Sequence, residues 1–108
     1  MIKLCHLDDI NEGESRGFKS GEYNVFAVKK QGEVYLYHNS CPHLGISLEW
    51  MPDQFLDVEG SLIQCATHGA LFLIESGECI AGPCQGDCLL PCPFSVQQDG
   101  QIYIQITT

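Results

Sequence analysis

The chain contains short runs of β-branched and aromatic residues, and turn residues separate these runs. Residues 23–28 and 34–37 are two such runs, and both favour strands. The polar stretch 30–33, Lys-Gln-Gly-Glu, lies between them and predicts a hairpin turn.

Further strands are predicted downstream at residues 62–64, 70–74, 94–97 and 101–106. Ser76-Gly77 is a turn signal after the second of these, and Gln98-Asp99-Gly100 joins the last two as a hairpin. Ile102, Ile104 and Ile106 alternate with polar residues, which places them on one face of a strand. No stretch shows a helical period for ten residues, although residues 45–50 come nearest. We therefore expect one all-β domain over residues 1–108.

Composition and charge narrow the class of protein. A chain of 108 residues with 44% hydrophobic residues supports one modest core. The formal net charge of −9 argues against nucleic-acid binding, which depends on Lys and Arg. Such acidity fits docking onto a basic patch of another protein, and it fits solubility alone equally well.

The chain has no apolar run of the roughly 18 residues that a membrane helix needs. Its first residues, MIKLCHLDDINEGE, do not follow the pattern of a secretory signal. We expect no membrane contact and a cytoplasmic location. Seven cysteines, an odd number, then indicate metal binding more than a disulfide framework.

Two pairs of cysteine and histidine carry the strongest chemical signal. Cys41-Pro42-His43 and Cys65-Ala66-Thr67-His68 each follow an apolar run and each lead into a glycine-bearing turn. One reading is a tetrahedral zinc site that stabilises a structural or interaction module. The other is a [2Fe-2S] cluster of the Rieske type, in which two His replace two Cys on one iron. Mixed pairs favour the second reading, because each loop can then reach both metals.

The segments CPHLG and CATHG resemble the two cluster-binding boxes of Rieske ferredoxins and Rieske domains. The likeness extends to the strand entering the second box, to Gly82-Pro83 as a covering proline loop, and to a terminal hairpin. It implies a Rieske fold of antiparallel sheets, with a small cluster-binding subdomain at about residues 39–84 set on a β base that both chain ends build.

Carried onto matching positions, the resemblance places Cys41 and Cys65 on a buried iron, and His43 and His68 on the other iron near the surface. Leu44 and Pro83 match positions that shield the cluster from water. There are two departures from the family pattern. A longer stretch of 21 residues separates His43 from Cys65, and alanine replaces the usual proline after Cys65.

High-potential relatives carry an additional disulfide beside the cluster, and they carry serine and tyrosine hydroxyls that bond to sulfur. The matching positions here are Ile46 and Thr67 for the disulfide and Ala70 and Phe72 for the hydroxyls. Because hydrogen bonds to sulfur stabilise the reduced state, their loss predicts a midpoint near the low end of the Rieske range, about −150 mV.

The remaining candidates are weaker. Cys79, Cys84, Cys88 and Cys92 could form a second metal site, but their spacing matches no usual cluster pattern, and ordinary core or surface thiols are the favoured interpretation. Cys5 is expected in the core, and neither His6 nor His38 is counted as a ligand. His38 is expected to be a plain strand-end histidine, with a supporting contact beside the cluster as the alternative. The segment 50–57 is interpreted as a loop whose Trp50 and Phe55 cap the core, with a docking surface as the alternative.

The function implied is that of a soluble carrier of one electron between a flavoprotein reductase and a terminal oxygenase or reductase. The sequence has no nucleotide fingerprint, so catalysis is expected in the partners. Three alternatives stay open. One is the Rieske-like small subunit of assimilatory nitrite reductase, and another is the zinc-stabilised module. The third is a regulatory subunit with a Rieske fold and a redox-silent cluster.

Overall fold

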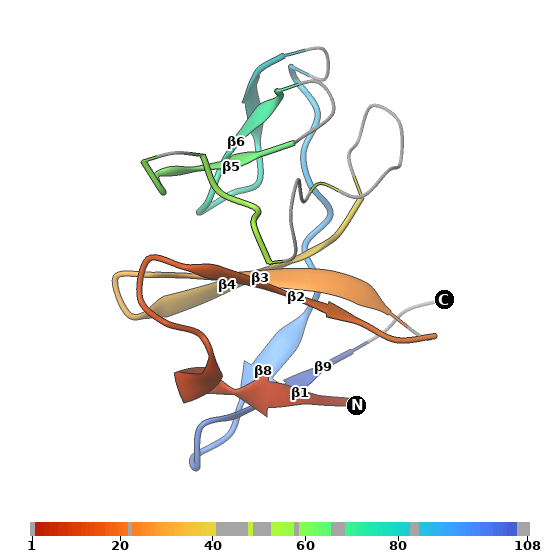
Figure 1. The fold of residues 1–108 in the computed structure, drawn as a ribbon. Helices are drawn as coiled ribbons and strands as arrows, with labels where there is room; N and C mark the ends of the chain where they lie inside the picture. The colour runs from red at the N-terminus through yellow and green to blue at the C-terminus, as the bar shows by residue number, and fades with distance from the viewer. Residues whose placement is uncertain are drawn as a thin grey trace.

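In the part of the chain that the computed structural model describes, nine short strands form three antiparallel sheets (Figure 1). The structure describes residues 2–21, 23–40, 48, 53–57, 59–65, 69–82 and 85–105. The three sheets stack along the longest of the molecule's dimensions, which are 39, 31 and 23 Å. The predicted all-β class with antiparallel sheets is confirmed.

The terminal sheet joins the two ends of the chain. It contains β1 (Ile2–His6), β8 (Phe94–Val96) and β9 (Gln101–Ile104), with β9 in the centre. Ile2 lies opposite Ile104, and a one-residue irregularity separates the pairs made by Lys3 and Cys5. A single-turn 3₁₀ helix, η1 (Leu7–Asp9), follows β1. The β base made from both ends, which the family likeness implied, is present.

The middle sheet consists of consecutive hairpin strands, β2 (Ser15–Lys19), β3 (Asn24–Lys30) and β4 (Glu33–His38). The predicted turn between β3 and β4 is confirmed. Gln31 and Gly32 both have positive φ, 53° and 78°, which is the backbone of a type I′ hairpin. The Glu12 carboxylate accepts the N–H groups of both turn residues at 2.6 and 2.8 Å, which fixes the turn.

Both faces of the middle sheet are buried. Val25 and Ala27 pack toward the terminal sheet, whereas Phe26 and Val28 pack toward the third sheet. This explains why the sequence there is a continuous apolar run instead of an alternating one. The middle sheet thus separates two hydrophobic cores.

The third sheet contains β5 (Leu62–Gln64), β6 (Leu71–Leu73) and β7 (Cys79–Ala81) in that order. The loop before β5 closes the core between this sheet and the middle one. Phe55 is fully buried there and stacks on Phe26, with ring centroids 4.4 Å apart. The core-capping interpretation of Phe55 is confirmed, and Trp50 lies outside the described residues.

The segment after β7 returns to the middle sheet before β8 begins. The Cys92 N–H donates to the Leu36 carbonyl at 3.0 Å, and the His38 N–H donates to the Leu90 carbonyl at 2.9 Å. The chain therefore lengthens the sheet along the outer edge of β4. Among the described residues, no helix is long and apolar enough to cross a membrane.

Candidate functional site

The second Cys/His box begins where β5 ends. Cys65 is fully buried, and its N–H donates to the Ala70 carbonyl at 2.9 Å. The Gly69 N–H donates back to the Cys65 carbonyl, also at 2.9 Å. These two bonds close the loop between β5 and β6 at both ends, so Cys65 is held at a fixed place in the core.

The surroundings of Cys65 are apolar. Ala70, Phe72 and Ile63 are fully buried in the same core cluster as Cys65. Gly69, at the far end of the loop, is exposed. The box therefore runs from the core to the surface between its first and last described residues.

Gly82, after β7, lies directly on this loop. Its φ is +104°, and a Cβ added to it would lie 2.7 Å from the Ala70 Cα. Only a residue without a side chain allows that approach. The segment that the family likeness identified as a covering loop therefore contacts the second box at Gly82, while Pro83 lies outside the described residues.

Three of the four predicted ligands, Cys41, His43 and His68, lie outside the described residues, as does the predicted shield Leu44. Cys65 is the one that the structure places. Within the described part of the chain, no group of three or more His, Cys, Asp or Glu side chains is arranged to hold a metal ion. The four-ligand set therefore stays a prediction.

The residues on each side of the first box are described, and they meet. Asn39 lies two residues before Cys41, and its Oδ1 accepts the backbone N–H of Leu48 at 2.7 Å. No pattern in the sequence indicates this contact, because it joins positions nine residues apart through a side chain.

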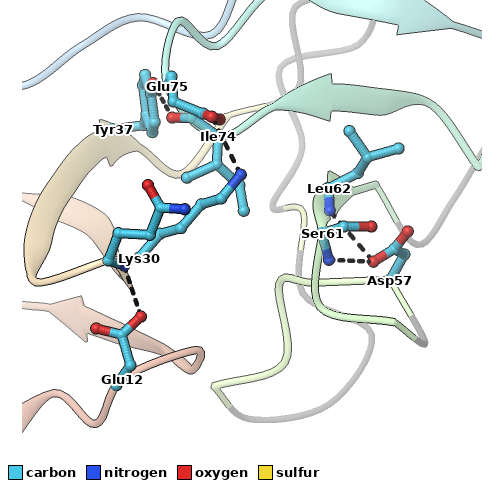
Figure 2. Close-up of polar contacts among 9 residues, drawn as sticks. Glu12, Lys30, Tyr37, Asp57, Ser61, Leu62, Ile74 and Glu75 are labelled. Carbon is cyan, nitrogen blue, oxygen red and sulfur yellow. Dashed lines mark hydrogen bonds and ion pairs between the residues drawn. The ribbon is translucent and has the colours of Figure 1, made fainter.

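A turn after β6 is tied to the middle sheet from two directions (Figure 2). The Tyr37 hydroxyl donates to the Ile74 carbonyl at 2.6 Å within the core. The Lys30 ammonium pairs with the Glu75 carboxylate at 3.1 Å near the surface. Because β4 leads toward the first box and β6 leaves the second, Tyr37 couples the two strands that flank the boxes.

The other cysteines agree with ordinary packing. Cys5, Cys79 and Cys92 are buried, Cys88 is exposed, and Cys84 lies outside the described residues. Burial, with a smaller contribution from Asp9, raises the pKa of the Cys5 thiol to about 11, and burial also raises the pKa of Cys92. Thiols buried in this way stay protonated at neutral pH.

The two histidines outside the boxes lie at strand ends, as predicted for His38. His38 is the last residue of β4. His6 ends β1, where its Nδ1 accepts the Asp8 N–H at 3.0 Å and its Nε2 lies 2.7 Å from the Asp99 carbonyl oxygen. His6 therefore fastens β1 to the hairpin between β8 and β9.

Charge is distributed unevenly along the chain. The first 30 residues hold all five Lys and Arg and five of the 14 Asp and Glu, so their formal charges cancel. Residues 31–108 hold the other nine carboxylates and no Lys or Arg. The whole net charge of −9 therefore belongs to the part of the chain with both Cys/His pairs.

The described part of the site fits an iron–sulfur centre. A cluster needs thiolates held in apolar surroundings with restricted access of water, and the Cys65 loop supplies such a place. The exposed end of the loop suits a histidine ligand at the surface.

Comparison with known proteins agrees with this chemistry. The Rieske [2Fe-2S] domain family matches residues 1–102. The ferredoxin component of the alkene monooxygenase system of Xanthobacter autotrophicus is 35% identical over 77 residues, which are 71% of this chain and 60% of that protein. The ferredoxin component of the p-cumate 2,3-dioxygenase system of Pseudomonas putida is 31% identical over 107 residues, 98% of this chain and 86% of that protein.

Among solved structures, a chain in the complex of reduced oxygenase and oxidized ferredoxin in carbazole 1,9a-dioxygenase superposes with a TM-score of 0.75 at 25% identity. The match covers 96% of this chain and all of that one. Sequence family, fold and the buried thiol at the second box agree. The chain belongs to the Rieske [2Fe-2S] domain family, whose cofactor is a [2Fe-2S] cluster.

Proposed function

We propose that this chain is a one-electron carrier with a [2Fe-2S] cluster held by Cys41, His43, Cys65 and His68. The proposal treats residues 1–108 as one domain, with the cluster-binding part at about residues 39–84. The observation that carries it is the Cys65 loop, which holds a buried thiol between two backbone hydrogen bonds.

The cluster, when bound, takes up and releases one electron. The chain's own residues set the conditions for that exchange. Cys65 and Cys41 would supply the buried thiolates, and His43 and His68 would supply imidazoles on the side where Gly69 is exposed. Gly82, although exposed, lies against the backbone of Ala70, and this close approach would cover the Cys65 loop at that point. An electron would thus cross at the histidine side.

The same residues favour a low midpoint potential. Ala70 and Phe72 are buried in the cluster of core residues that includes Cys65, and neither has a hydroxyl to donate to sulfur. The excess carboxylates of residues 31–108 further disfavour an added electron. We expect a midpoint near the low end of the Rieske range, about −150 mV.

The partners proposed are a flavoprotein reductase as donor and a terminal oxygenase as acceptor. Both similar relatives are ferredoxin components of oxygenase systems, and one similar chain was solved in a complex of oxygenase and ferredoxin. Catalysis then belongs to the partners. The cytoplasm is the proposed location, because the described thiols Cys5, Cys88 and Cys92 stand outside disulfides, as a reducing compartment requires.

Visible absorption and low-temperature EPR of the purified protein, before and after dithionite, test this function. A colour that bleaches, with a reduced signal at the low average g of a histidine-ligated cluster, is the expected result. Cys65→Ser should abolish both, whereas Cys88→Ser, which removes an exposed thiol, should leave both unchanged. A colourless protein that carries stoichiometric zinc after anaerobic purification would contradict the electron-carrier function and favour the zinc-stabilised structural module.

A further inference from the structure

Asn39 is the one buried polar or charged residue in the part of the chain that the structure describes, with 6% of its surface exposed. It follows β4 and lies two residues before the predicted ligand Cys41. A polar side chain in such a place costs free energy unless its hydrogen bonds are made. Its bonds therefore indicate its role.

The Asn39 side chain bonds to a residue on the other side of the first box. Its Oδ1 accepts the Leu48 N–H at 2.7 Å. Its backbone N–H donates to the carbonyl of Asn24 at 2.9 Å, and its Nδ2 lies 3.4 Å from the Asn24 Oδ1. Asn39 is thereby fixed to the start of β3, and the Leu48 backbone is bonded to this fixed residue.

Leu48 is anchored independently of this bond. Its side chain is fully buried in the core between the middle and third sheets, together with Phe26 and Phe55. Asn39 and Leu48 are therefore two fixed points on either side of the first box, and one buried hydrogen bond joins them.

The amide is needed at position 39 for that bond. A leucine of similar size would suit the apolar surroundings, but it would leave the Leu48 N–H buried without an acceptor. Loss of the acceptor for a buried N–H corresponds to a roughly 5- to 150-fold change in the equilibrium between the states with and without the contact of residues 39 and 48. No backbone carbonyl is recorded as an alternative acceptor for Leu48 among the described residues.

We propose that Asn39 is a positioning residue for the cluster: its side chain holds residues 39 and 48 together, on either side of the predicted ligands Cys41 and His43. This inference rests on the proposed function, since it needs the cluster to be bound there. Preorganisation of this kind lowers the cost of assembling a ligand set. Its expected consequence is slow release of iron from the folded protein.

The test compares Asn39→Leu with Asn39→Asp and with a control in the other core. Asn39→Asp keeps an oxygen that accepts the Leu48 N–H. Ile104→Val or Ile104→Ala, whichever matches the loss of thermal stability in Asn39→Leu, weakens the core beside the terminal sheet and leaves the loop alone. Iron release to a chelator is followed at neutral pH, below the unfolding transition, with EPR of each reduced protein.

Asn39→Leu is expected to release iron at least about fivefold faster than its stability-matched control. Asn39→Asp is expected to release iron more slowly than Asn39→Leu, because it keeps an acceptor for the Leu48 N–H, although it buries a carboxylate and loses the Nδ2 contact with Asn24. Equal release from Asn39→Leu and its control would overturn the inference, since the effect would then be general stability.

Amide exchange of Leu48 in the natural protein gives a measurement that needs no variant. If the Leu48 amide exchanges only through global unfolding, the inference is supported. Fast exchange of this amide overturns the inference. This holds even where Asn39→Leu fails to fold. If the natural chain shows no histidine-ligated EPR signal, the proposed function fails, and the inference falls with it. A normal EPR signal combined with fast exchange of the Leu48 amide would overturn the inference and leave the proposed function intact.

Discussion

At the residue scale, the contact between Gly82 and Ala70 has a direct test. Gly82→Ala places a Cβ 2.7 Å from the Ala70 Cα and 3.0 Å from its Cβ, so the covering segment must move. Gly86→Ala is a matched control, because Gly86 also has a positive φ, +99°, but open space around its Cα.

Both substitutions carry a backbone cost of about 1 kcal/mol for the positive φ. Gly82→Ala should cost a further 1–3 kcal/mol or so for the clash, measured by urea unfolding. It should also accelerate bleaching of the oxidised cluster in air, because displacement of the segment admits water. Indistinguishable unfolding midpoints for the two variants would mean that the covering segment yields freely.

The midpoint potential is the second property set by single residues. Ala70 and Phe72 lie on the buried face of the strand that leaves the second box, whereas the side chain of Leu71 is directed to the opposite face. Ala70→Ser with Phe72→Tyr adds two hydroxyls beside Cys65, and their hydrogen bonds to sulfur should raise the midpoint. Leu71→Thr adds a hydroxyl on the opposite face and should not shift it. Redox titration followed by circular dichroism measures both, and an unchanged double variant would show that the hydroxyls do not reach sulfur.

The sequence predicts a set of ligands but not the contacts around them. Cys65 and its three predicted partners follow from spacing and from family likeness, and the four-ligand set stays a prediction. The roles of Asn39 and Tyr37 could not be identified, because each bonds to a backbone group whose position depends on tertiary folding. A single asparagine or tyrosine in a strand carries no pattern of its own.

At the scale of elements, some strands could be predicted from the sequence and others could not. The hairpin of β3 and β4, the short strands β5 and β6, and the terminal hairpin were predicted to within a few residues. β1 and β2 were not. Ile2–His6 mixes apolar and charged residues, and Ser15–Lys19 holds one large apolar residue. These strands exist because β9 and β3 offer them partners, which local sequence cannot reveal.

Tyr37 joins β4 to the turn after β6, and its ionisation gives a pH test of that coupling. Burial, with Glu75 and nearby groups adding to the effect, raises the pKa of Tyr37 to about 12 from an ordinary value of 10. The folded state thus keeps the phenolic proton where the unfolded state loses it. The stabilisation is therefore complete below pH 10 and is lost as the pH rises toward 12.

Tyr37→Phe should destabilise the fold by about 1–3 kcal/mol near neutral pH, because the Ile74 carbonyl loses a buried donor. Its stability should also fall less steeply than that of the natural chain above pH 10. Glu75→Gln, which breaks the exposed pair with Lys30 and removes one negative charge near Tyr37, should cost less than about 1 kcal/mol. Denaturant unfolding across this pH range measures all three proteins. Parallel pH profiles for Tyr37→Phe and the natural chain would contradict the role given to the hydroxyl.

At the scale of the molecule, the uneven charge predicts how encounter depends on salt. All nine net negative charges belong to residues 31–108, and the third sheet of that part lies at the opposite end from β1 (Figure 1). Electron transfer from the reduced protein to cytochrome c, a basic acceptor, should therefore slow as ionic strength rises.

Two exposed carboxylates at opposite ends supply the comparison. Glu78, which precedes β7, should contribute to encounter, and Asp8, in the 3₁₀ helix after β1, should contribute little. Glu78→Gln is expected to lower the second-order rate constant at low salt more than Asp8→Asn does. Equal effects from the two variants would mean that net charge, and not its location, governs the encounter.

The pairing of β1 with β9 also bears on how the protein is made. The middle and third sheets close through neighbouring strands, so they can form early, whereas the terminal sheet needs segments from opposite ends of the chain. Both Cys/His pairs are synthesised before residues 101–104, with which β1 pairs. While the segment that carries both pairs is being made, β1 therefore has no partner strand, and the base of the fold is completed only after that segment exists.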